Sequence, residues 1–150
     1  MPDIEARTII NATPSVVRGV FLDFTKYSEW STFIKEISPS DKQEGPVPGK
    51  GLQVLLDFDG GSPQKMAPIV ITNSDAEFSW TGVLGVKSVF NGTHKFEFKP
   101  LEDGTKTELV QSETFGGVLR KPLLWYVGKK TQAGFEAFNK ALKDRVENSA

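Results

Sequence analysis

The sequence predicts an α+β fold in which a curved antiparallel sheet wraps round one long C-terminal helix. Two observations carry this prediction. Between residues 37 and 116 several segments alternate apolar and polar residues, which is typical of half-buried strands. From Pro122 to Val146 the apolar residues instead recur every three or four positions, as on one face of a helix. Sheet and helix segregated along one chain of 150 residues indicate a single α+β domain spanning 1–150.

The N-terminal part predicts one strand followed by two helices. Ile4 to Asn11 alternates and is rich in Ile and Thr, which favours a strand. Thr13 as N-cap and Pro14 at the first helical position then start a helix that ends near Lys26. A second, shorter helix is expected from Tyr27 to Ile34.

The middle of the chain predicts three further strands after a loop. Residues 37 to 51 are rich in Pro, Gly, Ser and charge, which indicates a loop with room for one edge strand. The strands are expected at Leu52 to Phe58, Met66 to Thr72 and Glu77 to Leu84. Pro68 makes the second of them an edge or irregular strand, because proline donates no ladder hydrogen bond.

The run from Phe90 to Gly116 predicts a β-hairpin with polar residues on its buried face. The inward phase of the two strands holds Phe90, Gly92, His94, Phe96, Phe98, Leu109, Gln111, Glu113 and Phe115. A four-residue loop, Leu101 to Gly104, would set His94 opposite Gln111 and Gly92 opposite Glu113. His94 is then expected to contact Gln111 and to lie diagonal to Glu113.

This polar set on an apolar wall predicts a cavity. An unpaired polar group inside a dry core costs about 1–3 kcal/mol, and an isolated carboxylate costs more. Trp80, on the inward phase of the preceding strand, would line the same space. In the alternative, the polar side chains satisfy one another or lie at the rim in water, and Trp80 only fills the core.

Composition excludes several function classes. A net charge of −1 with both signs mixed along the chain gives no basic field for nucleic acid. The absence of cysteine excludes disulfides and thiolate chemistry, and a single histidine makes a zinc site, or any metal site, unexpected. The N-terminus resembles neither a signal peptide nor a membrane anchor, so a cytoplasmic location without membrane insertion is expected. No phosphate-binding loop or nucleophile elbow is present, and no cofactor is predicted.

Several motifs together resemble the START-like (SRPBCC) superfamily, in particular its polyketide cyclase/dehydrase-like branch. The motifs are Tyr27-Ser28-Glu29-Trp30, Trp80-x-Gly82, Gly92-x-His94-x-Phe96, Asp103-Gly104-Thr105 and Gln111-x-Glu113-x-Phe115-Gly116. The resemblance covers nearly the whole chain. It implies the helix-grip fold, with a deep hydrophobic cavity between the sheet and the C-terminal helix.

Three functions follow as hypotheses. In the first, a small hydrophobic molecule, aromatic or polyketide-like, binds in the cavity against Trp80, His94, Phe96, Gln111, Glu113 and Phe115. In the second, the same cavity holds a cofactor-independent cyclase or dehydratase, with His94 and Glu113 as acid and base. In the third, the cavity is closed and exposed aromatics such as Trp125 and Tyr126 serve a protein partner or form a lid.

Overall fold

The computed structural model describes residues 1–58, 63–83 and 91–148. Two helices, two 3₁₀ turns and eight strands follow one another along them: β1 (Ile4–Ile10), α1 (Pro14–Leu22), η1 (Phe24–Glu29), β2 (Ile34–Pro39), β3 (Leu52–Leu56), β4 (Gln64–Met66), β5 (Ile69–Asn73), β6 (Glu77–Val83), β7 (Asn91–Leu101), η2 (Glu102–Gly104), β8 (Lys106–Gly116) and α2 (Arg120–Asn148). The predicted strand end at Leu84 and the predicted inward position of Phe90 lie outside the described residues.

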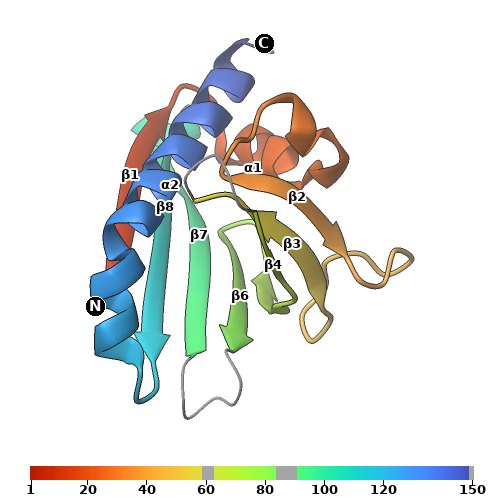
Figure 1. The fold of residues 1–150 in the computed structure, drawn as a ribbon. Helices are drawn as coiled ribbons and strands as arrows, with labels where there is room; N and C mark the ends of the chain where they lie inside the picture. The colour runs from red at the N-terminus through yellow and green to blue at the C-terminus, as the bar shows by residue number, and fades with distance from the viewer. Residues whose placement is uncertain (59–62, 84–90, 149–150) are drawn as a thin grey trace.

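The predicted α+β architecture is confirmed. A curved five-stranded antiparallel sheet has the order β1-β8-β7-β6-β5, and a second sheet has the order β2-β3-β4 (Figure 1). A backbone hydrogen bond from Leu52 to Pro68 and a bridge between Gly51 and Ile69 connect the two sheets. The helix α2 lies along β1, where Gln132 and Asn139 donate to backbone carbonyls of that strand.

The first helix begins as the sequence predicts. The Thr13 hydroxyl accepts from the Val16 amide at 3.4 Å, and Pro14 occupies the first turn. Its buried residues Val17 and Phe21 face the sheet. Phe21 is the centre of an aromatic core whose rings include Phe78, Phe96, Phe98 and Phe138.

The second predicted helix is present, but it begins and ends earlier than the predicted Tyr27 to Ile34 and is a 3₁₀ helix. Residues Phe24–Glu29 form it, with the Tyr27 hydroxyl donating to the Phe21 carbonyl at 2.6 Å. Strand β2 then starts at Ile34. A β-bulge between Ile34 and Glu36 turns both Ile34 and Ile37 inward, and this spacing of three residues imitates a helix.

The strand predicted from Met66 to Thr72 is two strands. β4 ends at Met66 and β5 begins at Ile69, so Pro68 lies between them. The Pro68 carbonyl accepts from Leu52, although its ring nitrogen has no proton to donate. Proline therefore marks the point where the chain passes from one sheet to the other.

Gly134 of α2 gives a first testable prediction. A Cβ at Gly134 would overlap the ring of Phe33, which also packs edge-on against Phe58 and Phe135. Gly134→Ala is expected to lower the free energy of unfolding by about 1–3 kcal/mol, because the Phe33 ring must leave its packed position against Phe58 and Phe135. Urea unfolding of purified variants measures this difference.

Gly128→Ala in the same helix is the matched control. A Cβ there meets only the Leu124 side chain, at an ordinary 3.6 Å. This substitution should leave stability unchanged or raise it by up to about 1 kcal/mol, the gain in helix propensity. Equal effects at the two glycines would contradict the packing of Phe33 against α2.

Candidate functional site

The hairpin of β7 and β8 brings the predicted polar residues together, but its register differs from the prediction. His94 lies opposite Glu113, Phe96 opposite Gln111 and Gly92 opposite Phe115. The predicted pairs of His94 with Gln111 and of Gly92 with Glu113 are therefore wrong by two residues. Because two is the period of a strand, every side chain keeps its predicted face.

The turn explains the shift in register. Glu102 and Asp103 both adopt positive φ, 50° and 58°, and Gly104 follows at 86°. These left-handed residues form a tight turn over Glu102–Gly104, and the ladder continues until Leu101 pairs with Lys106. The four-residue connection thus starts one position later than Leu101.

His94 is buried, with 2% of its surface exposed, and is enclosed by aromatic rings. Phe96 and Phe135 stack on its imidazole, each with a centroid distance of 4.6 Å. Trp80 of β6 lies edge-on at 4.7 Å. Burial lowers the pKa of His94 to about 4, so the ring is neutral at pH 7.

A buried hydrogen-bond chain fixes the tautomer of His94. The Asn139 amide donates to the Ala6 carbonyl at 3.1 Å, which leaves the Asn139 Oδ1 to accept from the Gln111 amide at 2.8 Å. The Gln111 amide also donates to the Phe135 carbonyl, so the Gln111 Oε1 must accept from His94 Nε2, at 2.8 Å. His94 therefore carries its proton on Nε2, and the lone pair of Nδ1 faces Glu113.

Glu113 lies next to His94 at the partly exposed end of this hydrogen-bond chain. Its Oε1 lies 3.6 Å from His94 Nδ1, and 15% of its side chain is exposed. Its Oε2 occupies the space that a side chain at Gly92 would take, 2.6 Å from an ideal Cβ. Burial raises the pKa of Glu113 to about 8, so at pH 7 the group is mainly a neutral carboxylic acid that can donate a proton.

The inward side chains of β8 become less buried toward the end of the strand, and so do the sheet-facing side chains of α2 toward its start. Gln111 is fully buried, whereas Glu113 and Phe115 further along β8 are only partly buried. The sheet-facing residues of α2 show the same trend, since Phe135 is fully buried and Leu124 only partly. The apolar side chains of helix and sheet are therefore fully covered near His94 and only partly covered near Phe115.

His94 and Gln111 hydrogen-bond each other, as expected in the alternative where the inward polar side chains pair among themselves and no ligand is needed. Phe135 fills the space above them, so the helix touches the wall where a cavity was expected. One buried polar atom on this wall is unsatisfied, because the indole N–H of Trp80 finds no hydrogen-bond partner in the part of the chain that is described. Asn139 was missed in the sequence, although an asparagine spaced with Phe135 and Leu142 in an apolar stripe was a signal.

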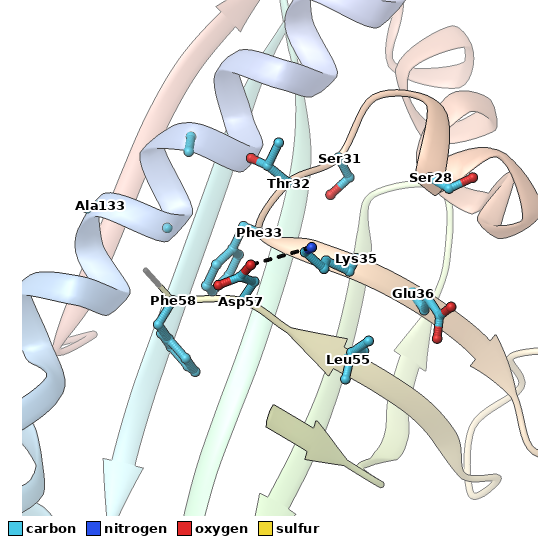
Figure 2. A pocket seen from close by; sticks show the side chains of 12 residues that line it. Ser28, Ser31, Thr32, Phe33, Lys35, Glu36, Leu55, Asp57, Phe58 and Ala133 are labelled. Atoms are coloured by element: carbon cyan, nitrogen blue, oxygen red, sulfur yellow. Dashed lines mark ion pairs between the residues drawn. The ribbon is translucent and has the colours of Figure 1, made fainter. Parts of the chain in front are cut away.

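A separate cleft of about 750 Å³ opens between α2, β2 and β3 (Figure 2). Its lining includes Ser28, Ser31, Thr32, Phe33, Lys35, Glu36, Leu55, Asp57, Phe58, Ala133, Gly134 and Ala137. Lys35 and Asp57 form an ion pair at 3.6 Å, and the buried Ser31 hydroxyl lacks a partner among the described residues. Phe33 separates this cleft from Phe135 and the His94 chain.

Metal ligation and membrane spanning find no support in the described ranges. No group of three His, Asp or Glu side chains within residues 1–58, 63–83 and 91–148 is placed to hold a metal ion. None of the helices in these ranges is both long and apolar enough to cross a bilayer.

An antiparallel sheet gripping a long terminal helix defines the START-like class of proteins, and comparisons agree with it. A START superfamily protein from Mycobacterium smegmatis has 18% sequence identity and a TM-score of 0.71, with 98% of each chain covered. The Zhui aromatase/cyclase from Streptomyces sp. R1128 has 13% identity and a TM-score of 0.68, covering 98% of this chain and 96% of its own. A structure from Thermus thermophilus has 15% identity and a TM-score of 0.73, with 98% of each chain covered. At these identities the likeness shows the fold alone.

The sequence match identifies the family within this class. The profile of the family described as polyketide cyclase/dehydrase and lipid transport matches residues 1–147. The chain belongs to this family, as the motifs around Trp80, His94 and Glu113 led us to expect. No curated protein sequence matches it.

Proposed function

We propose that this protein binds a small, largely apolar molecule between the sheet and the N-terminal half of α2. The loss of burial from Gln111 to Phe115, matched by the loss from Phe135 to Leu124, carries the proposal. Partly exposed apolar side chains on two neighbouring elements form the kind of surface that a small apolar ligand covers. The family and fold support the same class of function.

The polar groups at this end favour a ligand with a hydrogen-bond acceptor. The Glu113 carboxylic acid is a donor at pH 7, and the buried indole N–H of Trp80 is a second donor without a partner among the described residues. A carbonyl of a quinone, flavonoid or aromatic polyketide would accept from such donors, while the partly exposed Phe115 supplies apolar contact area. His94, Phe96 and Gln111 would shape the closed end of the site.

Thermal-shift assays with quinones, fatty acids, flavonoids and polyketide aromatics test this proposal. A carbonyl-bearing aromatic is expected to raise the melting temperature of the wild type. Phe115→Ala should weaken binding about tenfold, since it removes apolar contact area worth more than about 1 kcal/mol. Thr114→Ala is the matched control, because Thr114 is exposed on the other face of the same strand. No stabilisation by any compound, together with no retained ligand in native mass spectrometry, would count against the proposal.

The alternative is a cyclase or dehydratase that works by acid and base in the same space. The observation in its favour is a neutral carboxylic acid beside an imidazole lone pair, Glu113 facing His94 Nδ1. Because rings enclose His94, Glu113 is the group that would touch a substrate, while His94 would hold that carboxyl in place. Glu113 would give its proton to the leaving hydroxyl as the C–O bond breaks and water departs, and the resulting carboxylate would take the proton from the adjacent carbon as the C=C bond forms. Turnover of a polyketide aldol substrate that is unaffected by Glu113→Gln and by His94→Ala would exclude this role.

A further inference from the structure

The start of α2 carries exposed aromatic residues on its outward side. Trp125 is 87% exposed and Tyr126 is 76% exposed, although large aromatic side chains in folded proteins are normally covered. Val118 and Leu119, just before the helix, are exposed as well. We call Trp125, Tyr126 and the exposed cations beside them, Lys121, Lys129 and Lys130, the outward face.

The outward face combines aromatic rings with positive charge. Residues four apart share a helix side, so Lys121, Trp125 and Lys129 form one row, with Tyr126 and Lys130 in the row beside it. No acidic residue occurs between Glu113 and Glu136 in the sequence. Arg120 is paired with Asp3, so its charge is balanced and the lysines carry the net charge of the patch. The patch is therefore cationic, although the whole chain has a net charge of −1.

We propose that the outward face docks the protein on an anionic phospholipid surface. Tryptophan and tyrosine favour the boundary between headgroups and acyl chains, because their rings are apolar with one polar end. Lysines beside them reach the headgroup phosphates while their methylene stems lie along the apolar layer. Charge and ring chemistry thus match one occupant, a membrane with acidic lipids, to which the protein would bind peripherally.

The position of the outward face is consistent with delivery of an apolar molecule. Leu124 and Val127 belong to the same helical turns and are partly buried, whereas Trp125 and Tyr126 point away from the core. Docking would therefore bring the helix that covers the proposed ligand site to the bilayer, with the site on the other side of that helix. The docking itself does not depend on the proposed function, because it needs no ligand.

Vesicle binding tests the proposal with the full chain. The wild type should sediment with phosphatidylcholine vesicles that contain about one quarter phosphatidylserine, and should release them as salt screens the lysines. Trp125→Ala with Tyr126→Ala, and separately Lys121→Glu with Lys129→Glu, should each weaken binding by about tenfold or more. On binding, the tryptophan emission should shift to the blue, and Trp125→Phe should remove that shift.

Two controls separate docking from general effects. Ile9→Ala changes an exposed apolar residue on β1, and Lys140→Glu changes an exposed cation later in α2; both should bind like the wild type. Absence of binding to anionic vesicles at low salt would overturn the proposal. It would also be overturned if the variants of the outward face bound as the wild type does, or if the aromatic residues proved to hold a dimer that binds no vesicles.

Discussion

Gln111→Leu is expected to lower the free energy of unfolding by about 2–6 kcal/mol. Leucine has a similar size but leaves two buried groups unpaired, the His94 Nε2–H and the Asn139 Oδ1, each at a cost of about 1–3 kcal/mol. The Gln111 side chain has no exposed surface, so water cannot replace the lost partners without opening the core. Chemical unfolding followed by tryptophan fluorescence measures the loss.

Gln132→Leu provides the comparison. The Gln132 amide also donates to a backbone carbonyl of β1, that of Glu5 at 2.8 Å, but it lies at the partly exposed edge of α2. Water can solvate the Glu5 carbonyl there, so the expected cost is below about 1 kcal/mol. Similar losses at the two glutamines would show that the chain from Ala6 to His94 is not a buried network.

The second large effect is a loss of stability above pH 6.5 that depends on Glu113. Burial raises its pKa from 4.5 to about 8, so between these values the folded state binds more protons than the unfolded state. Stability therefore falls as pH rises through this range. His94 has the opposite sign, because burial lowers its pKa from 6.5 to about 4 and stability rises with pH between these values.

The two slopes cancel between pH 4.5 and 6.5, where both groups titrate only in the unfolded chain. Above pH 6.5 only the titration of Glu113 still changes the free energy of unfolding. It lowers this free energy by about 2 kcal/mol between pH 6.5 and pH 8. Glu113→Gln, a neutral replacement of similar shape, should abolish this fall. Glu97→Gln, on the side of β7 that points away from the core and beside Lys99, should keep the wild-type profile. Parallel stability profiles for wild type and Glu113→Gln would refute the assignment.

The faces of the hairpin residues were predictable, and their register was not. Alternation alone sets His94, Gln111 and Glu113 on one side, because the side-chain period of a strand is two. The pairing depends on the turn, and nothing in Glu102 or Asp103 signals that both adopt positive φ. The same limit explains the strand β2, where a bulge gives Ile34 and Ile37 a helical spacing.

The sequence alone could not predict that Phe135 fills the space above His94. A helical stripe containing Phe135 shows which side of α2 is buried, but not which ring meets which strand residue. That depends on the position of the helix along the sheet. The hydrogen bond between Asn139 and Gln111 also joins residues far apart in the sequence. The sequence could therefore suggest that the inward polar side chains pair with one another, but it could not decide between such pairing and a cavity.

The anchoring of the polar chain on β1 has a consequence for folding during synthesis. Ala6 and Asn139 are 133 positions apart, and among the described strands β1 pairs only with β8. Contacts between distant segments form late and slowly, because a long loop must close first. On the ribosome, the first strand must therefore wait until β8 and most of α2 have emerged, and nascent chains stalled before Asn139 should lack the orientation of His94. Chaperones would meet this protein with its earliest strand still unpaired.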